Sequence, residues 1–414
     1  MDKTIRLEAK WIIPVSSPPI EDGVIIIREG RILFIGKEED CPDVYCDEII
    51  DCQHQIVMPG LINPHTHLSL SGLKGRIREG IGFTDWIREV VSYTREMNQE
   101  EEIFWAKMGI DELVSAGTTT IGDISRLGYS WNILKEKGLR GIVYIEVIGF
   151  NRSQREKEIR ALQVSIESLS LNGKVRVGVS PHSPYTLSQA LLKESYSFAV
   201  ERDYPIAIHI AETLSESEFI KRGTGEIRDL MIGFGLWDEG WNPSGDSPVR
   251  YLNSLGVLKG IMGIHLNHVD DQDLDLLEEN KVSVIFCPGS NQWFGREIRY
   301  PLSVFLERGI NVALGTDSLA SNWSLNPFLE MRRTKSLFPQ LDYHHLIEMC
   351  TINGAKALNM EDQIGDLSIG KYADIVIIDL PDGMIRDPAE YVVTKINKVK
   401  GILIEGKVLM PKLK

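Results

Sequence analysis

The middle of this chain alternates short apolar segments with longer segments of amphipathic, helical character. Strands that alternate with helices in this way form βα units around a parallel sheet. Eight such units in succession match a closed barrel better than an open sheet, so the pattern predicts an α/β fold, a (β/α)8 TIM barrel. The eight apolar segments are residues 55–63, 117–125, 140–149, 175–182, 204–212, 261–268, 282–291 and 311–318.

The two ends of the chain differ from the middle, because they consist of short Val- and Ile-rich segments separated by Gly-marked turns. This composition is typical of antiparallel strands. We expect the two ends to pair into one small β-sandwich that flanks the barrel. The predicted divisions are residues 1–58 for the first part of the sandwich, 59–362 for the barrel and 363–414 for the second part of the sandwich.

Polar side chains stand where the predicted strands end. His65 and His67 follow the first apolar segment at a spacing of two residues. Residues at this spacing share one face of a strand, so both can reach one ion. A lone pair is weak evidence for a metal, but a barrel gathers all its strand ends around one mouth. The other polar strand ends are His182 at the fourth strand, His209 and Glu212 at the fifth, His265 at the sixth and Asp317 at the eighth.

Imidazole and carboxylate groups at one barrel mouth are the usual ligands of a transition metal. Three imidazoles and a carboxylate suit Zn2+ and leave room for a water molecule. Fe2+ is compatible with the same ligands, so both ions stay open. Taken alone, Asp317 would be a turn residue and Glu212 a charge at the entrance of a helix. Their agreement with the other strand ends favours a metal site.

The arrangement resembles the amidohydrolase superfamily, and within it the deaminase branch, over nearly the whole chain. The branch has a His-x-His motif after the first strand and a His-x-x-Glu motif after the fifth, as in PHTH and HIAE here. Two-metal relatives carry a lysine at the fourth strand end, where this chain reads VGVSPHSPY. The resemblance therefore implies one divalent metal, with the ligands His65, His67, His209 and Asp317.

The same resemblance implies a mechanism. A bound metal lowers the pKa of its water toward about 7, which supplies hydroxide at neutral pH. Asp317 takes the proton of that water as the hydroxide attacks an amidine-like carbon. Glu212 protonates the ring nitrogen and later the departing ammonia, and His265 holds the developing tetrahedral oxygen.

Several segments are most similar to aminodeoxyfutalosine deaminases of the alternative menaquinone pathway, which replace the 6-amino group of an adenine nucleoside by oxygen. They are GTTTIGDIS, EVIGFN, SPHSPYTLS, KRGTGEIRDL, CPGSN and TDSLASNWSLN, together with FTDW. Deaminases of S-adenosylhomocysteine, methylthioadenosine and adenosine share the catalytic residues and stay open as alternatives. Two features depart from the aminodeoxyfutalosine group: the basic segment 68–82, and Ser318 where many relatives have Gly.

Four residues are candidate substrate contacts. His182 lies in SPHSPYT, whose histidine faces the substrate in the resembling branch. Trp86 either stacks on a purine or packs under its loop. Ser290 and Asn291 of CPGSN either touch the substrate or belong to an ordinary turn.

The connection 213–262 is long for one βα unit. Long loops at the catalytic end of a barrel form lids or substrate walls, and a surface excursion without ligand contact is the alternative. Arg76 and Arg78 face a similar choice between a substrate carboxylate and solvent. The histidines that fit no strand end, and are therefore structural or exposed, are His54, His268, His344 and His345.

Charge and composition limit the partners. A net charge of −14 argues against nucleic acid and anionic membranes, so we expect a small-molecule purine nucleoside. The five cysteines are scattered without a CxxC pair, as in reduced cytosolic proteins. No signal peptide is visible, and no apolar run approaches the roughly 20 residues of a membrane span. We expect a cytoplasmic protein; a homodimer is implied only by the resemblance.

Two other functions stay open. A triazine-type hydrolase, which expels chloride or an amine, would share the fold. The retained Glu212 favours ammonia, because a poor leaving group needs protonation. Outside the enzymes, a catalytically inert metal-binding scaffold is the alternative, and the complete ligand set argues against it.

Overall fold

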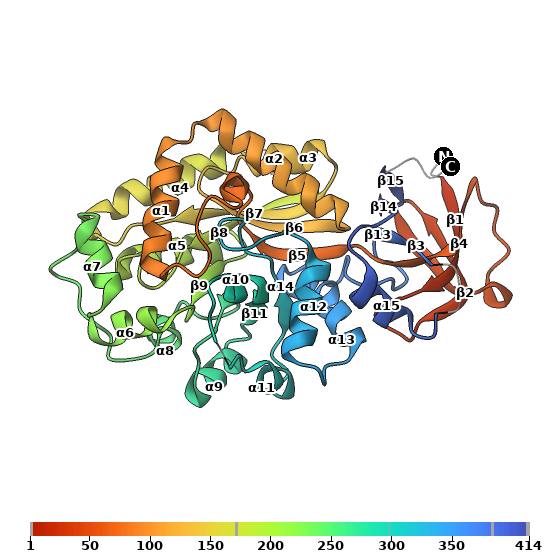
Figure 1. Ribbon diagram of the computed structural model, residues 1–414. Coiled ribbons are helices and arrows are strands. Elements are labelled where there is room, and N and C mark those ends of the chain that lie inside the picture. Colours follow the sequence, from red (N-terminus) through yellow and green to blue (C-terminus); the bar gives the residue numbers. More distant parts are fainter. Residues whose placement is uncertain (1–2, 170–172, 298, 382–384, 411–414) are drawn as a thin grey trace.

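Eight parallel strands form the central barrel of the computed structural model, which describes residues 3–169, 173–297, 299–381 and 385–410. Each of the eight predicted apolar segments contributes one of them (Figure 1). They are β5 (Leu61–Thr66), β6 (Thr118–Ser125), β7 (Arg140–Val147), β8 (Val175–Pro181), β9 (Ala207–Ile210), β10 (Met262–His265), β11 (Ser283–Phe286) and β12 (Val312–Leu314).

Two seams close the barrel. The strands pair as two parallel sheets, β5-β6-β7-β8 and β9-β10-β11-β12. A bridge between Val179 and Ile206 joins β8 to the chain before β9. At the other seam, the backbone N–H of Asp317 donates to the carbonyl of His65 at 3.2 Å. The predicted barrel is confirmed, and its second seam brings the ends of β5 and β12 together.

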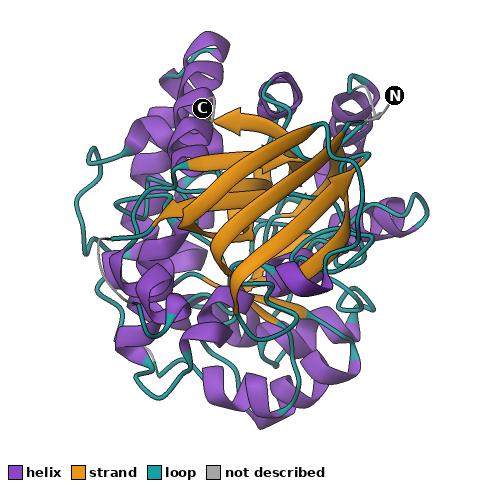
Figure 2. Ribbon diagram, turned by 90° about the vertical axis from the view of Figure 1, so that its right-hand side faces the viewer, coloured by secondary structure: helices purple, strands orange, loops and turns teal. Residues whose placement is uncertain are grey.

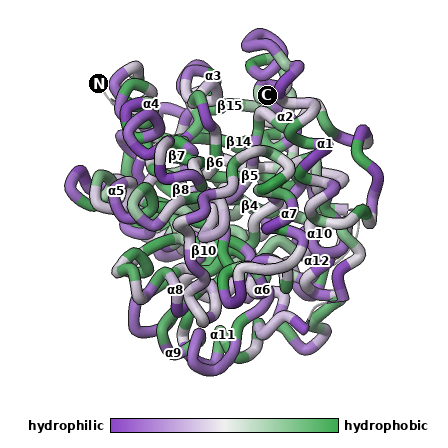
Figure 3. The backbone as a smooth tube through the Cα atoms, turned by 90° about the vertical axis from the view of Figure 1, so that its left-hand side faces the viewer, coloured by the Kyte–Doolittle hydropathy of each residue, from purple (hydrophilic) through white to green (hydrophobic). Residues whose placement is uncertain are grey.

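Helices cover the outside of the barrel, and Figure 3 shows apolar residues gathered along the central strands. No helix in the described part of the chain has the length and apolar character needed to cross a bilayer. The helices are η2 (Leu68–Leu73), α1 (Phe83–Glu96), α2 (Gln99–Ser115), α3 (Ser130–Glu136), η3 (Arg152–Gln154), α4 (Arg155–Glu167), α5 (Gln189–Val200), α6 (Leu214–Arg222), α7 (Glu226–Gly233), α8 (Pro248–Ser254), α9 (Asp271–Glu279), α10 (Pro288–Trp293), α11 (Leu302–Glu307), α12 (Pro327–Leu337), α13 (Tyr343–Met349) and α14 (Ile352–Ala357).

The two chain ends form one further sheet, shown face-on in Figure 2. It has seven strands in the order β15-β14-β13-β4-β1-β2-β3. We expected antiparallel pairing, yet β1 and β4 are parallel, because β4 returns to the far side of β1 after the β2–β3 hairpin. The elements of this domain are β1 (Thr4–Ile12), β2 (Ile20–Arg28), β3 (Arg31–Lys37), η1 (Glu38–Asp40), β4 (Glu48–Pro59), β13 (Ile375–Asp379), α15 (Pro388–Lys395), β14 (Gly401–Ile404) and β15 (Lys407–Met410).

The chain passes from the sheet into the barrel at Gly60. The strand β4 ends at Pro59 and β5 begins at Leu61, so the apolar segment 55–63 contains parts of two strands in two sheets. A Cβ on Gly60 would lie 2.2 Å from the hydroxyl oxygen of Thr119, so only glycine fits this crossing without a local shift. The proposed domain ranges include residues 1–2, 170–172, 298, 382–384 and 411–414, which lie outside the described residues.

Candidate metal centre

Four side chains predicted as metal ligands converge at the carboxyl ends of the barrel strands. His65 is on β5, His67 directly follows it, His209 is on β9 and Asp317 follows β12. The Nε2 atoms of His65 and His67 lie 3.6 and 3.9 Å from Oδ1 of Asp317. The Nε2 atoms of His67 and His209 are 3.3 Å apart. These distances place nitrogen and oxygen donors around one point.

The backbone at this mouth takes an unusual conformation. Four non-glycine residues at the strand ends have positive φ angles: Ala211 at 52°, His265 at 74°, Leu266 at 50° and Asp317 at 58°. Left-handed backbone is unfavourable for such residues and gathers at functional sites. Here it turns the chain out of β9, β10 and β12 while their polar side chains remain at the mouth.

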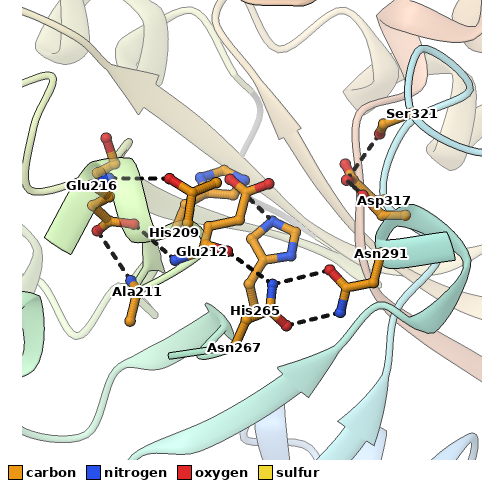
Figure 4. A network of polar contacts seen from close by, with 12 residues as sticks. His209, Ala211, Glu212, Glu216, His265, Asn267, Asn291, Asp317 and Ser321 are labelled. Atoms are coloured by element: carbon orange, nitrogen blue, oxygen red, sulfur yellow. Dashed lines mark hydrogen bonds and ion pairs between the residues drawn. The ribbon is translucent and has the colours of Figure 1, made fainter. Parts of the chain in front are cut away.

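Neighbouring groups hold two of the candidate ligands in place. The Nδ1 atom of His209 lies 3.0 Å from the carbonyl of His182, which leaves Nε2 toward the cluster. The carboxylate of Asp317 accepts hydrogen bonds at Oδ2 from Ser290 at 2.8 Å and Ser321 at 2.9 Å (Figure 4). The backbone N–H of Ser318 donates to Oδ1 at 2.7 Å. Ser290, a candidate substrate contact, thus has its hydroxyl on Asp317.

Electrostatics give these ligands the protonation states that a cation requires. Burial, together with the nearby His65, lowers the pKa of His67 to about 3. Burial and the nearby His182 also lower the pKa of His209 far below its usual value. Burial alone would raise the pKa of Asp317, but contact with His65 and the other histidines holds it well below the ordinary value. Metal ligands bind as neutral imidazoles and ionised carboxylates.

Unpartnered nitrogen atoms test whether these residues fit a metal. Both ring nitrogens of His65, and Nδ1 of His265, are buried without a hydrogen-bond partner. A buried polar atom without a partner costs free energy and is rare. Two overlapping sets of donor atoms, each within 4.8 Å of one another, are His65 with His209 and His265, and His65 with His67 and Asp317. The residues therefore fit a divalent ion with imidazole and carboxylate ligands.

Glu212 lies beside this cluster, between a histidine and an arginine. Its Oε2 is 3.8 Å from Nε2 of His265, and its Oε1 accepts a hydrogen bond from Nη1 of Arg296 at 3.0 Å. The backbone N–H groups of Ala211 and Glu212 donate to the carboxyl group of Glu216 at 3.0 and 2.8 Å. Burial raises the pKa of Glu216 to about 8 despite these donors.

Arg296 and Glu216 are site residues that the sequence analysis missed. A signal exists for Glu216, because Thr213 and Glu216 stand at the spacing of a helix N-cap, and the Thr213 hydroxyl accepts a hydrogen bond from the backbone N–H of Glu216. No comparable signal marks Arg296, which follows α10 rather than a strand end.

The remaining candidate substrate contacts lie around the cluster. The ring of His182 is 4.8 Å from that of His209, and its Nε2 is 3.9 Å from a carboxylate oxygen of Glu146. Asn291 exchanges amide hydrogen bonds with Asn267, which in turn donates to the carbonyl of Glu212 at 3.1 Å. The structure thus directs the Asn291 amide toward Asn267 (Figure 4).

Trp86 belongs to a group of packed aromatic rings, Phe83, Trp86 and Phe294, which we call the aromatic wall. Its indole stacks on Phe83 with ring centres 5.8 Å apart and meets Phe294 edge-on at 5.4 Å. Its Nε1 donates to the carbonyl of Ala320, three residues after Asp317. Phe83 covers one face of the indole, which favours the packing of Trp86 under its loop.

Five residues considered for other roles lie away from the cluster. Arg76 and Arg78 are exposed, and Arg76 lies over the ring of Trp105. His344 contacts the carbonyl of Val15 at 3.0 Å. His54 and His345 are exposed, whereas His268 is half-buried near Glu212 and Arg296.

The long connection after β9 is fixed to its neighbours. It forms α6, α7 and α8. Its residues Phe219 and Trp241 stack at 4.5 Å and surround Phe150, which follows β7. The guanidinium of Arg152 donates to both carboxylate oxygens of Asp238. These contacts favour a fixed wall over a surface excursion.

Comparison with known proteins identifies relatives along nearly the whole chain. Residues 56–409 match the model of the amidohydrolase family. A 5-methylthioadenosine/S-adenosylhomocysteine deaminase of Thermoanaerobacter pseudethanolicus is 32% identical over 430 aligned positions, covering 99% of this chain and 94% of the relative.

Solved structures share the fold at lower identity. A zinc-bound adenosine deaminase of Xanthomonas campestris superposes with a TM-score of 0.85 at 22% identity, covering 98% of this chain and 92% of that one. The aminofutalosine deaminase of Helicobacter pylori, in complex with methylthio-coformycin, superposes with a TM-score of 0.86 at 19% identity, covering 98% of this chain and 100% of that one.

Proposed function

Since this chain belongs to the amidohydrolase family, we propose that it is a metal-dependent deaminase of an adenine nucleoside. The observation that carries the proposal is Glu212, whose carboxylate lies 3.8 Å from His265 at the edge of the histidine and aspartate cluster. A proton-transferring acid at this position suits the loss of ammonia, because an amine leaves poorly unless it is protonated.

We propose that His65, His67, His209 and Asp317 hold one divalent ion, zinc or iron. The support is the convergence of their donor atoms and the unpartnered nitrogens of His65. When bound, such an ion acidifies a water molecule, so that a strong nucleophile exists at neutral pH.

The chain's own residues supply the proton transfers. Asp317, ionised and held by Ser290 and Ser321, accepts a proton from the attacking water. Glu212 delivers its proton to the ring nitrogen next to the attacked carbon, regains one from the hydroxyl group of the tetrahedral adduct and passes it to the amino group. The C–N bond then breaks, and ammonia leaves. The proton that Asp317 accepted later returns Glu212 to its acid form. His265, whose burial lowers its pKa, stands as a neutral donor toward the tetrahedral oxygen.

Within the adenine nucleosides, two observations favour different substrates. The sequence segments favour aminodeoxyfutalosine and thus a role in menaquinone synthesis, whereas the name of the Thermoanaerobacter relative favours methylthioadenosine or S-adenosylhomocysteine. An ammonia-release assay with these three nucleosides and adenosine separates the cases. We expect release from at least one, and a clear preference for aminodeoxyfutalosine. Comparable rates on all four would contradict the narrow assignment and leave a broad deaminase.

Replacement of Glu212 tests the mechanism. Glu212→Gln keeps the size of the side chain but removes its proton, so we expect kcat to fall by about a hundredfold or more. Elemental analysis should show the same metal content as in the wild type. Glu279→Gln, which changes an exposed carboxyl group on α9, is the matched control. Full turnover by Glu212→Gln would contradict deamination and favour a triazine-type hydrolase. Metal binding by the wild type without ammonia release would favour an inert scaffold.

We further propose a cytoplasmic location and a homodimer. All five cysteines are free, which suits a reducing compartment. The homodimer rests on the resemblance alone.

A further inference from the structure

Arg296 stands between the proposed catalytic acid and the aromatic wall. Its Nη1 atom donates to Oε1 of Glu212 at 3.0 Å and lies 3.4 Å from Oδ1 of Asn291. The other oxygen of Glu212, Oε2, faces His265. One carboxylate oxygen is therefore occupied by Arg296, and the other lies on the side of the metal cluster.

Aromatic rings hold the guanidinium in this position. Its central carbon lies 4.1 Å from the ring centre of Phe294 and 5.4 Å from that of Phe83. The side chain is only 13% exposed. Its second terminal nitrogen, Nη2, is buried without any hydrogen-bond partner. A buried cationic donor left unsatisfied is costly, so this nitrogen is suited to an acceptor supplied by a ligand.

We infer that Arg296 is a specificity-determining residue, which binds a hydrogen-bond acceptor on the ring of the substrate. The inference rests on the proposed function, because Glu212 fixes where the ring lies. The protonated ring nitrogen must reach Glu212, and Arg296 is the direct neighbour of Glu212. The group that meets Nη2 is therefore on the heterocycle and not on the 5′ substituent of the ribose.

Two ring acceptors have this chemistry. One is the second pyrimidine nitrogen, N3 of adenine. The other is an oxo group on the carbon between the two nitrogens, as in isoguanine. Both accept a hydrogen bond from an arginine N–H, and both lie on the ring edge that continues from the nitrogen protonated by Glu212. Arg296 donates a hydrogen bond to the proposed catalytic acid Glu212. The basic residues Arg76 and Arg78, by contrast, are exposed.

Substrate analogues combined with variants test this inference. Wild type, Arg296→Met and Arg296→Lys are compared on adenosine, 3-deazaadenosine and isoguanosine, by kcat/KM and by calorimetric dissociation constants of the deaminated products. Arg296→Lys keeps a positive charge next to Glu212 but lacks the second nitrogen. Arg299→Met, an exposed arginine of the same segment, is the control, and melting temperatures verify that each variant is folded.

The informative quantity is the ratio of kcat/KM between substrates, compared between each variant and the wild type, because a uniform loss of rate on every substrate leaves this ratio unchanged. We expect one of two kcat/KM ratios to be about ten- to a hundredfold larger in the wild type than in both Arg296 variants. These are the ratio of adenosine to 3-deazaadenosine and the ratio of isoguanosine to adenosine. The first result identifies the ring nitrogen, the second the oxo group. Arg299→Met should keep the wild-type ratios.

Ratios that are unchanged in both Arg296 variants would overturn the inference, even if their rates fall. That result would assign Arg296 to the positioning of Glu212 only. If wild-type protein released no ammonia from any of the four nucleosides of the assay under "Proposed function", the proposed function would fail and the inference with it. If the wild type releases ammonia and both Arg296 variants keep its substrate ratios, only the inference on Arg296 is contradicted and the proposed function stands.

Discussion

Burial decides the protonation of some acids near the barrel mouth, and Asp123 on β6 shows this at the scale of one residue. Burial raises the pKa of Asp123 to about 7, although the backbone N–H of Leu68 and the hydroxyl of Ser130 are hydrogen-bonded to it. The bonded Leu68 is the residue directly after His67. Below about pH 7, a neutral acid at Asp123 therefore anchors the turn that carries a proposed metal ligand.

The raised pKa of Asp123 predicts a pH-dependent stability. In the unfolded chain an aspartate loses its proton near pH 4, whereas folded Asp123 keeps it until about pH 7. Between these values the unfolded state binds fewer protons, so the free energy of unfolding falls as the pH rises from about 4 to 7. Asp123→Asn does not titrate and retains an acceptor for Leu68 and a donor for Ser130.

We therefore expect the free energy of unfolding of Asp123→Asn, relative to that of the wild type, to rise by up to about 4 kcal/mol between about pH 4 and pH 7. Urea unfolding at several pH values, with a chelator present throughout, measures the difference. Asp43→Asn, at an exposed position, should follow the wild type. Parallel curves for Asp123→Asn and wild type would show that Asp123 is ionised in the folded protein.

At the residue scale, strand ends are what the sequence predicts well. His65, His209 and Asp317 end different strands, and a closed barrel must bring such positions to one mouth. Arg296 reaches the same place from the turn after the short helix α10. No spacing of residues in the sequence predicts that position. Asn291 is in the predicted segment, but its partner Asn267 could not be inferred, because side-chain pairing depends on the final packing.

At the scale of elements, the connection after β9 is held by aromatic side chains. Phe219 on α6 is fully buried, stacks on Trp241 and lies 5.8 Å from Phe150. Asp238 adds four hydrogen bonds with the backbone and side chain of Arg152. This packing holds α6 to α8 against their neighbours, and Glu216 on α6 accepts a hydrogen bond from the backbone N–H of Glu212.

Truncation of Phe219 tests whether this connection is a fixed wall. Phe219→Ala removes a buried ring from the stack, so we expect a loss of about 3–5 kcal/mol in the free energy of unfolding and a lower kcat/KM. Urea denaturation and the ammonia assay measure the two effects. Phe104→Ala, at a half-exposed position on α2, should change stability by less than about 0.5 kcal/mol. A small effect of Phe219→Ala would instead favour a mobile lid.

The elements themselves are largely predictable from the alternation of apolar and amphipathic segments. The segment 55–63 shows the limit, because its uninterrupted apolar character conceals a change of sheet at Gly60. The parallel pairing of β1 with β4 is a second example. Strand direction there depends on how a long connection crosses the sheet, which local composition does not determine.

At the scale of the whole molecule, the proposed metal site joins strands from both halves of the barrel. His65 belongs to the first sheet, whereas His209 and Asp317 belong to the second sheet or follow it. A bound ion therefore links the two four-stranded sheets across their seam. Anything that binds only the folded state stabilises it by mass action.

Removal of the metal should lower the melting temperature of the whole chain. An ion at a thousandfold excess over its dissociation constant contributes about 4 kcal/mol. We expect dialysis against a chelator to lower the melting temperature, and Zn2+ to restore it. Asp317→Asn should respond far less to either treatment. Equal responses of wild type and Asp317→Asn would contradict the ligand assignment.

A buried ionic cluster joins the barrel to the sheet built from the chain ends. Arg140, at the start of β7, contacts Asp374 and Glu405 at 3.0 Å each. Both Arg140 and Asp374 are almost fully buried. This cluster thus links β7 to two residues more than two hundred positions later in the sequence.

Arg140→Met tests this dependence, because it leaves the Asp374 carboxylate buried without its cation. Such a loss costs about 3–5 kcal/mol, measured as the free energy of unfolding in urea. Asp374→Asn removes the orphaned charge, so Arg140→Met/Asp374→Asn should be less destabilised than the sum of the single variants by about 1 kcal/mol or more. Additive losses would mean that each group is stabilised independently. A smaller loss in Arg140→Met than in the control Arg308→Met, which lies in exposed ion pairs, would show that the barrel holds the sheet without this cluster.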